Sequence, residues 1–429
     1  MKGTQDKNMR SIGISKLGAM FALTLLFSVN AVAQVRGGSG GSLIPQTAPG
    51  ETAEGELPAR PRGGIRMGPL VVYPDVSYQI HRNDNIFQQA PESGAVKSDS
   101  IAVLKLGAHL EGKQGPHLYT FGVATSLGRY TSSAPDNFNI FNTFARANLN
   151  PDTRVRIGLD ADHTDGVDPR GSTNDPLAST PNRYRQDNLS GVVSYGAPGA
   201  QGRIDVALGG MAKRYVNNRE STFVNDRSEN FLGGTYYWRI APKTSLLAEI
   251  RRTNVDYTDP GSRLDSTEMR YLGGVTWEAT ALTTGIVKVG YLTKDFKDPA
   301  TPGGRGLSWE AGVNWSPLTY STWNFVTSKA TRETTGNVGN FVLASNYLAR
   351  WTHAWTDRIS TTATGMYGID DYKGIDRRDK IAQLGLGGRY QFRRWLSVGA
   401  DYTRSTRSSS ASSADFTKND FMLFVDVNL

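Results

Sequence analysis

The ten residues TRVRIGLDAD, at positions 153–162, decide the fold class. Apolar side chains stand at every second position with polar residues or glycine between them, since Val155, Ile157, Leu159 and Ala161 alternate with Arg154, Arg156, Gly158, Asp160 and Asp162. Successive side chains of a β-strand point to opposite faces, so this period of two predicts a strand with one apolar face. Units of about ten residues with the same alternation, rich in aromatic and β-branched residues, recur from Leu70 to Leu429.

The connections between these strands distinguish a membrane barrel from a soluble sandwich, whose strands would alternate as well. Short turns, such as 113–116, 150–152 and 393–394, alternate along the chain with longer polar loops, such as 82–98, 165–183 and 333–339. Eight turns and nine loops predict eighteen strands, an even number with both ends on the short-turn side, as in bacterial outer-membrane barrels. Strand boundaries taken from a sequence shift by a few residues, so 16 and 20 strands are the alternatives.

The composition excludes other classes of protein. The chain of 429 residues has 47 Gly and no Cys, which excludes a disulfide framework, cysteine-ligated metal and cysteine catalysis. Beyond residue 33 no apolar run reaches the roughly 18 residues that a membrane helix needs. In lipid every backbone polar group must be paired internally, and a closed sheet achieves this without helices. We therefore predict an all-β fold, a transmembrane antiparallel up-and-down β-barrel of about eighteen strands formed as a single domain by residues 67–429.

The N-terminal region predicts export. Residues 1–33 combine a basic start, an apolar centre at 17–29 and the small-residue motif Ala31-Val32-Ala33, as in a secretory signal peptide cleaved after Ala33. Residues 34–66, rich in Gly, Ser and Pro, predict a disordered periplasmic leader, with a docking segment for a periplasmic partner as the alternative.

Export and the barrel together predict location in the outer membrane of a Gram-negative bacterium, in contact with outer-membrane lipid. Cleavage removes four basic residues and one acidic residue and lowers the net charge from +8 to +5. That excess is too small to indicate nucleic-acid binding. The sequence leaves the oligomeric state open.

No catalytic or metal-binding motif stands out. The five His residues are scattered without metal-ligand spacing, and no local motif selects a nucleophilic serine. Residues 160–166 resemble the start of a calcium loop, but the glycine comes one position late and position 172 is Ser where such a loop needs Glu. We predict no enzyme activity, no cofactor and no metal.

The polar faces of the strands predict a charged lumen. The candidate lumen residues are ten basic and six acidic side chains: Arg154, Arg156, Arg203, Lys213, Arg251, Arg270, Lys288, Arg350, Arg389 and Arg404, with Asp160, Asp205, Glu249, Glu268, Glu310 and Asp401. A pore with charged walls passes polar or anionic solutes, and an excess of basic residues favours anions. The alternative is a wall of mutually neutralising ion pairs without selectivity.

Aromatic residues near the predicted strand ends suit the girdles that flank the apolar band of such barrels. They are Tyr73, Tyr130, Tyr195, Trp238, Tyr257, Trp277, Trp315, Trp351 and Trp395. The alternative for each of them is the ordinary preference of aromatic residues for strands.

The approach to the first strand resembles a known family. Residues 59–74 read ARPRGGIRMGPLVVYP and residues 83–87 read NDNIF, similar to the opening of the putative beta-barrel porin 2 family, in which a basic Arg-Pro segment precedes a Gly-Ile-Arg strand. Residues 215–218 and the late glycine-rich strands also look similar, so the resemblance covers roughly residues 60–429. The final residue, Leu429, departs from the Phe or Trp that ends many such barrels.

The resemblance implies a channel associated with exopolysaccharide synthesis, which would carry polymer across the outer membrane with a periplasmic polysaccharide-export protein. The residues themselves do not specify this substrate. Two hypotheses therefore stand: a translocon subunit for exopolysaccharide export, and a general diffusion porin for small polar or anionic solutes. Porins usually fold a long loop into the lumen, and the longest candidate for such a loop is 165–183.

Overall fold

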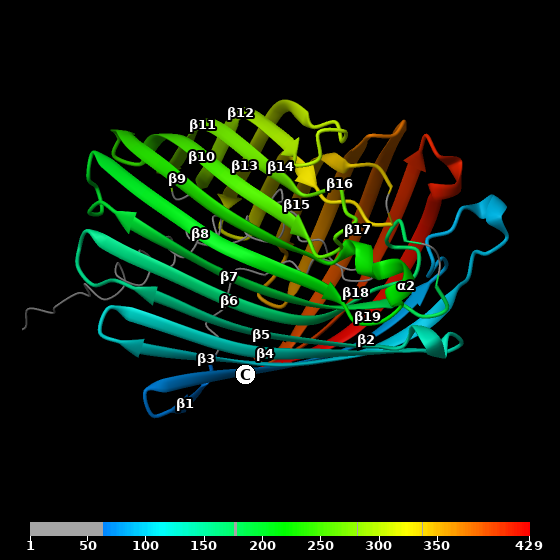
Figure 1. Ribbon diagram of the computed structural model, residues 1–429. Helices are drawn as coiled ribbons and strands as arrows, with labels where there is room; N and C mark the ends of the chain where they lie inside the picture. Colours follow the sequence, from blue (N-terminus) through cyan, green and yellow to red (C-terminus); the bar gives the residue numbers. More distant parts are fainter. Residues whose placement is uncertain (1–62, 176–177, 281, 337) are drawn as a thin grey trace, which may run out of the picture.

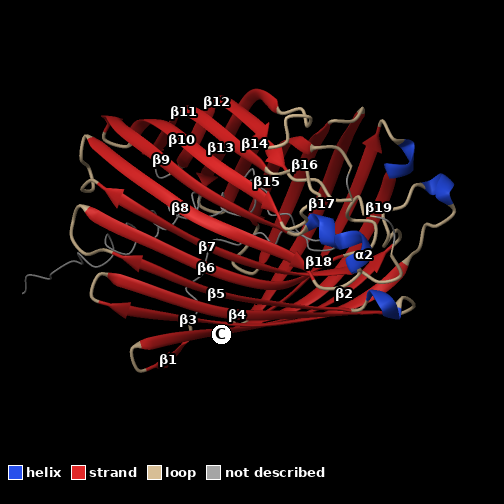
Figure 2. Ribbon diagram, viewed as in Figure 1, coloured by secondary structure: helices blue, strands red, loops and turns tan. Residues whose placement is uncertain are grey.

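The computed structural model describes residues 63–175, 178–280, 282–336 and 338–429. The predicted signal peptide at 1–33 and most of the predicted leader at 34–66 therefore lie outside the described residues. Strands make up almost all of the described chain (Figure 2). The helical segments are one turn long: α2 (Arg219–Thr222) and the 3-10 helices Pro91–Ser93, Ala134–Asp136, Phe223–Asn225 and Ser412–Ala414.

Within the described chain no helix has the length and apolar character needed to cross a membrane.

Eighteen strands, β2 to β19, form one closed antiparallel barrel (Figure 1). Each strand pairs with the next in sequence, and β19 closes the barrel on β2 from Asp420↔Asn83 to Asn428↔Asp75. The bounds are β1 (Ile65–Met67), β2 (Leu70–Asn83), β3 (Asp99–Gln114), β4 (His117–Tyr130), β5 (Phe138–Leu149), β6 (Val155–Asp168), β7 (Asn182–Tyr195), β8 (Gly202–Tyr215), β9 (Arg227–Ala241), β10 (Thr244–Tyr257), β11 (Ser266–Thr280), β12 (Thr283–Phe296), β13 (Gly304–Leu318), β14 (Ser321–Arg332), β15 (Phe341–Ala354), β16 (Ile359–Lys373), β17 (Arg377–Arg393), β18 (Leu396–Ser409) and β19 (Phe416–Asn428).

The predicted barrel of about eighteen strands is confirmed. A short additional strand, β1, pairs with the start of β2 and begins two residues before the predicted start of the barrel at 67. The long loop predicted at 165–183 is shorter, because β6 continues to Asp168 and β7 begins at Asn182. The pairing of β6 with β7 continues as far as Asp168↔Asn182.

The outward face of the barrel carries the apolar side chains that the alternation predicts. Leu159, Leu189 and Leu384 are 45%, 66% and 66% exposed, and Leu159 lies on the face opposite Arg156 and Asp160 of its strand. Exposure of large apolar side chains around a whole barrel suits contact with lipid and would be unfavourable in water.

Three of the predicted girdle aromatics instead face inward. Tyr73 stacks on His109 with ring centroids 4.6 Å apart, Tyr130 pairs with Ile101 on the inner face, and the Tyr257 hydroxyl donates a hydrogen bond to Glu333 at 2.9 Å. A tyrosine near a strand end can place its hydroxyl in a polar lumen as well as at a membrane interface, so its position along the strand does not decide its face. Trp238, Trp277, Trp315 and Trp351 lie on the outward face.

The closure of the barrel is held by side chains on its inner face. The Ser77 hydroxyl on β2 donates to Asp426 on β19 at 2.6 Å, and Arg389 on β17 donates to the same carboxylate at 2.7 Å. His81 on β2 lies 3.0 Å from Asp420 on β19. The contacts from Ser77 and His81 join the first and last strands of the barrel, which are far apart in sequence.

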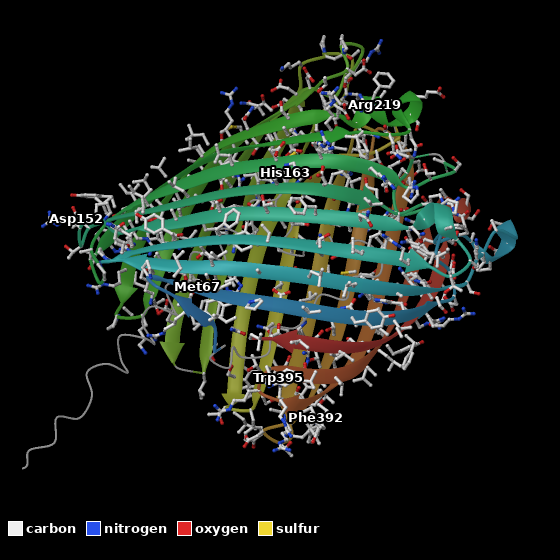
Figure 3. All side chains as sticks on the ribbon, turned by 90° about the horizontal axis from the view of Figure 1, so that it is seen from below. Met67, Asp152, His163, Arg219, Phe392 and Trp395 are labelled. Atoms are coloured by element: carbon white, nitrogen blue, oxygen red, sulfur yellow. The ribbon has the colours of Figure 1, made fainter. Side chains whose placement is uncertain are left out.

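The two ends of the barrel differ in their connections. Asp152, in the turn between β5 and β6, and Arg219, in α2, lie at opposite ends of the barrel (Figure 3). The first of these ends carries the short turns, and the second carries the longer loops, including 84–98, 169–181 and 216–226. In outer-membrane barrels short turns are periplasmic and longer loops are extracellular, which orients this chain in the membrane.

Candidate functional site in the barrel lumen

Fourteen of the sixteen predicted lumen residues lie on the inward face of the barrel. The strand registers place them on one side of the wall, as in the row formed by Arg156, Ser194 and Asp205 on β6, β7 and β8. The fourteen are Arg156, Asp160, Arg203, Asp205, Lys213, Glu249, Arg251, Glu268, Arg270, Lys288, Glu310, Arg350, Arg389 and Asp401.

The other two predicted lumen residues lie elsewhere. Arg154 belongs to the turn before β6, where its backbone N–H donates to Asp152 at 2.5 Å. Arg404 points outward from β18, on the same face as the exposed Tyr402, and its guanidinium donates to Asn419 at 3.2 Å. It lies near the loop end of its strand, beyond the apolar part of the outward face. In the sequence, a charged residue at such a position shows the same alternation as a residue that faces the lumen.

Four of the predicted residues form a buried ion cluster on neighbouring strands. Glu310 on β13 lies between Arg270 on β11 and Lys288 on β12, with both N···O distances 2.5 Å. Lys288 also lies 2.9 Å from Glu249 on β10. Arg270 and Glu310 are 2% and 1% exposed, so neither charge is compensated by bulk water. Each charge depends instead on the opposite charges beside it.

Ion pairs recur along the rest of the wall. Arg203 lies 3.1 Å from Asp205, and Lys213 lies 3.5 Å from Asp168. With Arg270, Lys288 and Arg389, five of the ten predicted basic residues therefore form ion pairs. Many of the charges on the inner wall are therefore paired.

Several inward-facing arginines also lie against aromatic rings. The guanidinium of Arg251 lies 4.0 Å from the ring centroid of Phe231, and that of Arg203 lies 3.9 Å from that of Tyr237. A cation over a ring face gains electrostatic energy and loses side-chain freedom. These contacts fix the positions of charged groups along the wall.

A second buried ion pair involves two residues that are not among the predicted lumen residues. Lys294 on β12 lies 2.6 Å from Glu333, and both side chains are fully buried. Burial disfavours the charged carboxylate, but Lys294 and Arg227 with the hydrogen bonds from Lys294 and Tyr257 together outweigh it and hold the pKa of Glu333 below its ordinary value. Glu333 falls within the predicted loop 333–339, and no local pattern assigns an inward partner to a loop residue.

Loops from opposite sides of the barrel meet at its extracellular mouth, in a contact that we call the loop bridge. Asn174, in the loop between β6 and β7, donates from its backbone N–H to Thr335, in the loop between β14 and β15, at 3.0 Å. Its side-chain amide donates to the Tyr372 hydroxyl on β16 at 3.2 Å and accepts from Arg377 on β17 at 3.0 Å. The loop bridge comprises Asn174, Asp175, Asn225, Thr335, Gly336, Tyr372 and Arg377.

A third loop supports the same contact. Asn225, in the loop between β8 and β9, donates to Asp175 at 3.0 Å and accepts from the Gly336 N–H at 3.3 Å. Gly336 has a φ of +66°, and a Cβ there would lie 2.6 Å from the Asn174 carbonyl oxygen, so the close approach requires glycine. Burial raises the pKa of the Asp175 carboxyl, although the bond from Asn225 opposes that shift.

The topology shows that the loop bridge crosses the lumen. In the closed order of eighteen strands, β6 and β7 lie on the opposite side of the ring from β16 and β17. A loop that starts on one wall and bonds to the other must therefore span the opening. The loop that does so is the one that the sequence singles out as the longest candidate for folding inward.

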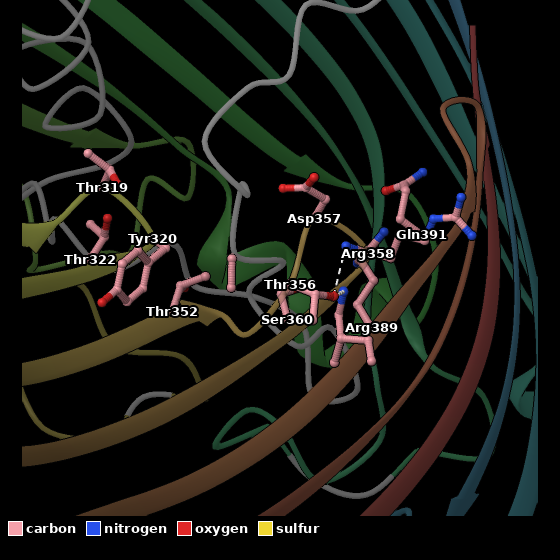
Figure 4. A pocket seen from close by; sticks show the side chains of 12 residues that line it. Thr319, Tyr320, Thr322, Thr352, Thr356, Asp357, Arg358, Ser360, Arg389 and Gln391 are labelled. Atoms are coloured by element: carbon pink, nitrogen blue, oxygen red, sulfur yellow. Dashed lines mark hydrogen bonds between the residues drawn. The ribbon is translucent and has the colours of Figure 1, made fainter.

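The periplasmic end of the lumen contains a small pocket (Figure 4). It lies beside the turns that follow β13, β15 and β17, and its lining includes Tyr320, Arg358, Arg389 and Gln391. The described residues include no group of three His, Cys, Asp or Glu side chains arranged to hold a metal ion.

These features define a class of protein: a transmembrane β-barrel channel of the outer-membrane type, with a charged inner wall and loops folded over its mouth. The chain belongs to the family described as putative beta-barrel porin 2, which matches residues 59–429. Both the fold and the family are of the channel type. A search of curated proteins found no match.

Several solved outer-membrane proteins are similar in structure. Pseudomonas aeruginosa OprD is 11% identical, with a TM-score of 0.44 over 83% of this chain and 95% of that chain. A BenF-like porin from Pseudomonas fluorescens Pf-5 is 10% identical, with a TM-score of 0.47 over 83% and 99%. The outer membrane protein opdK from Pseudomonas aeruginosa is also 10% identical, with a TM-score of 0.47 over 83% and 99%.

Proposed function

We propose that the protein is a diffusion porin for small polar solutes, with at most a weak preference for anions. The observation that carries this proposal is the loop bridge, which divides the extracellular opening of the lumen by hydrogen bonds between opposite walls. A divided opening favours small solutes, which pass one at a time and regain their hydration shell quickly, over a long polymer. The inner wall offers such solutes many charged and hydrogen-bonding groups.

Export of exopolysaccharide with a periplasmic partner is the less favoured function. A polymer would have to displace the loop bridge and hold it open while the chain passes. The family description names a porin and gives no polymer substrate. We therefore assign neither an export partner nor a catalytic role to this chain.

The ion pairs of the wall support weak charge selectivity. A basic side chain paired with a carboxylate attracts a passing anion less than a free one, because the two charges partly cancel. Arg251 is held against Phe231 and Arg156 donates to the Gly196 carbonyl, and neither forms an ion pair in the described residues, so we propose that these two arginines attract anions. We propose that the fourteen inward-facing residues line the permeation path.

The proposed function is tested with the full mature chain in liposomes and with a deletion strain. We expect swelling rates that fall steeply with the size of neutral sugars, and slower uptake of small solutes in the deletion strain with normal extracellular polysaccharide. The opposite pair of results, loss or periplasmic trapping of polysaccharide with unchanged small-solute uptake, would favour export.

Opening the loop bridge should widen the channel. The double variant Asn174→Ala with Asn225→Ala removes the side-chain contacts to Tyr372, Arg377, Asp175 and Gly336. We expect the single-channel conductance in planar bilayers to rise roughly twofold, because the narrowest part of a pore dominates its resistance.

Asn150→Ala is the matched control, since Asn150 is also a hydrogen-bonded asparagine but lies in a short periplasmic turn, where it donates to the Pro116 carbonyl at 2.8 Å. Its conductance should equal that of the unmodified protein. If the double variant also conducts normally while its loops are accessible to protease, the loop bridge does not limit permeation.

A further inference from the structure

Three arginines near the loop end of the barrel point outward, away from the lumen. In the strand register, Arg404 on β18 lies opposite Asn419 on β19, Arg82 on β2 lies opposite Phe421 on β19, and Arg129 on β4 lies opposite Ala102 on β3. All three side chains are exposed. They occupy every second strand across the closure of the barrel and lie at similar heights on the wall, and we call them the seam arginines.

The seam arginines bind only neutral groups within the described chain. Arg82 donates to the Ser100 and Ser98 hydroxyls at 3.2 and 3.4 Å, and Arg404 donates to Asn419 at 3.2 Å. Arg129 donates to the Asn139 side chain at 3.0 Å and to two backbone carbonyls. Their charge is therefore not cancelled by an ion pair.

Two other exposed basic residues at this end form ion pairs with carboxylates. Arg185 on β7 lies 3.1 Å from Asp165, and Lys297, after β12, lies 2.5 Å from Asp256 and 3.3 Å from Asp265. The nearest acid to the seam arginines in the hydrogen-bond network is Asp84, whose carboxylate accepts bonds from the Asn419 N–H and side chain at 2.7 and 2.6 Å. Three arginines against one carboxylate leave a local positive excess.

The surface directly below the seam arginines is apolar and aromatic. Phe421, Ile80 and Leu423 are 47%, 48% and 49% exposed on the same outward face. Tyr402, beside Phe421, donates from its hydroxyl to Asn419 at 2.8 Å. Aromatic residues at this height mark the boundary between hydrocarbon and headgroups in a membrane barrel. The seam arginines therefore lie at the level of the outer-leaflet headgroups.

We propose that the seam arginines bind the phosphorylated sugar headgroup of an outer-leaflet glycolipid, whose acyl chains pack on Phe421, Ile80 and Leu423. Guanidinium groups bind phosphate through paired, charge-assisted hydrogen bonds. Neighbouring strands lie about 4.8 Å apart, so successive seam arginines are about 10 Å apart across the sheet. A headgroup with more than one phosphate can engage several arginines at this spacing at once, which favours it over a glycerophospholipid with a single phosphate.

The test is a binding titration of the full-length protein in detergent with a bis-phosphorylated, acylated glucosamine disaccharide. We expect the variant R82Q/R129Q/R404Q to bind this lipid about tenfold more weakly than the unmodified protein, because charge-assisted bonds to phosphate are lost. The lipid without its phosphates, and phosphatidylglycerol, should both bind the unmodified protein about as weakly as the intact lipid binds the variant.

The matched control is R185Q/R263Q/K297Q, which removes three exposed basic residues that are already paired with Asp165, Asp298 and Asp256. Its affinity should change less than twofold. If the seam variant fails to fold in a heat-modifiability assay, the single variants R82Q and R404Q replace it, each with about threefold weaker binding expected. Equal affinity for the seam variant and the unmodified protein, equal losses in both triple variants, or equal binding of the dephosphorylated lipid would overturn the proposal.

Discussion

Leu159→Arg is expected to block most assembly of the barrel in the membrane. Leu159 lies mid-strand on the lipid-facing side of β6 and is 45% exposed there. A cation near the bilayer midplane on a barrel's lipid face costs about 2 to 4 kcal/mol. The measurement is the fraction of folded protein in a heat-modifiability assay of outer-membrane fractions.

Two controls on β6 separate charge from other effects. Leu159→Ala removes apolar area without adding charge and should assemble nearly normally. Arg156→Ala changes the inward face, where the guanidinium donates to the Gly196 carbonyl at 3.2 Å, and should also assemble. Equal assembly defects in Leu159→Arg and Arg156→Ala would show that the assignment of the two faces is wrong.

Glu310→Gln should destabilise the folded barrel more than any other single change to the inner wall that we consider. It leaves Arg270 and Lys288 beside a neutral amide, and Arg270 is only 2% exposed. Removing one partner from a buried ion pair typically costs about 3 to 5 kcal/mol, because the remaining charge is left uncompensated. The measurement is the free energy of unfolding from urea titrations in liposomes.

Asp162→Asn is the matched control, because Asp162 also faces inward but forms no ion pair in the described chain. Its free energy of unfolding should change little. Adding Lys288→Gln to Glu310→Gln restores the charge balance of the cluster and should recover part of the loss. A double variant that is less stable than Glu310→Gln alone would contradict this account of the cluster.

The alternation of TRVRIGLDAD and of the similar stretches predicted the barrel and most of its inner wall. Side-chain direction in a strand is a local property, and lipid on one side requires apolar residues there. The short turns and longer loops are also local features of the chain, and counting them predicted the strand number. Fourteen of the sixteen candidate lumen residues consequently lie on the inward face.

Arg404 shows where this local reasoning fails. Its strand crosses the apolar band and continues into the headgroup region, where the outward face becomes polar. Alternation between apolar and polar residues stops there, and the sequence no longer distinguishes lumen from membrane surface. Tyr73 and Tyr257 also face inward, because an aromatic residue near a strand end fits either face and its position along the strand does not decide which.

The sequence by itself determined the fold class, a strand number of about eighteen and the inward face of most candidate lumen residues, because these follow from neighbours along the chain and from the solvent on each side. Only the tertiary structure decided which charges neutralise each other, as Glu310 does with Arg270 and Lys288. It also decided that Asn174 reaches Thr335 and Arg377 across the lumen. Closing the sheet brings strands together that are far apart in sequence, and no local pattern records those distances.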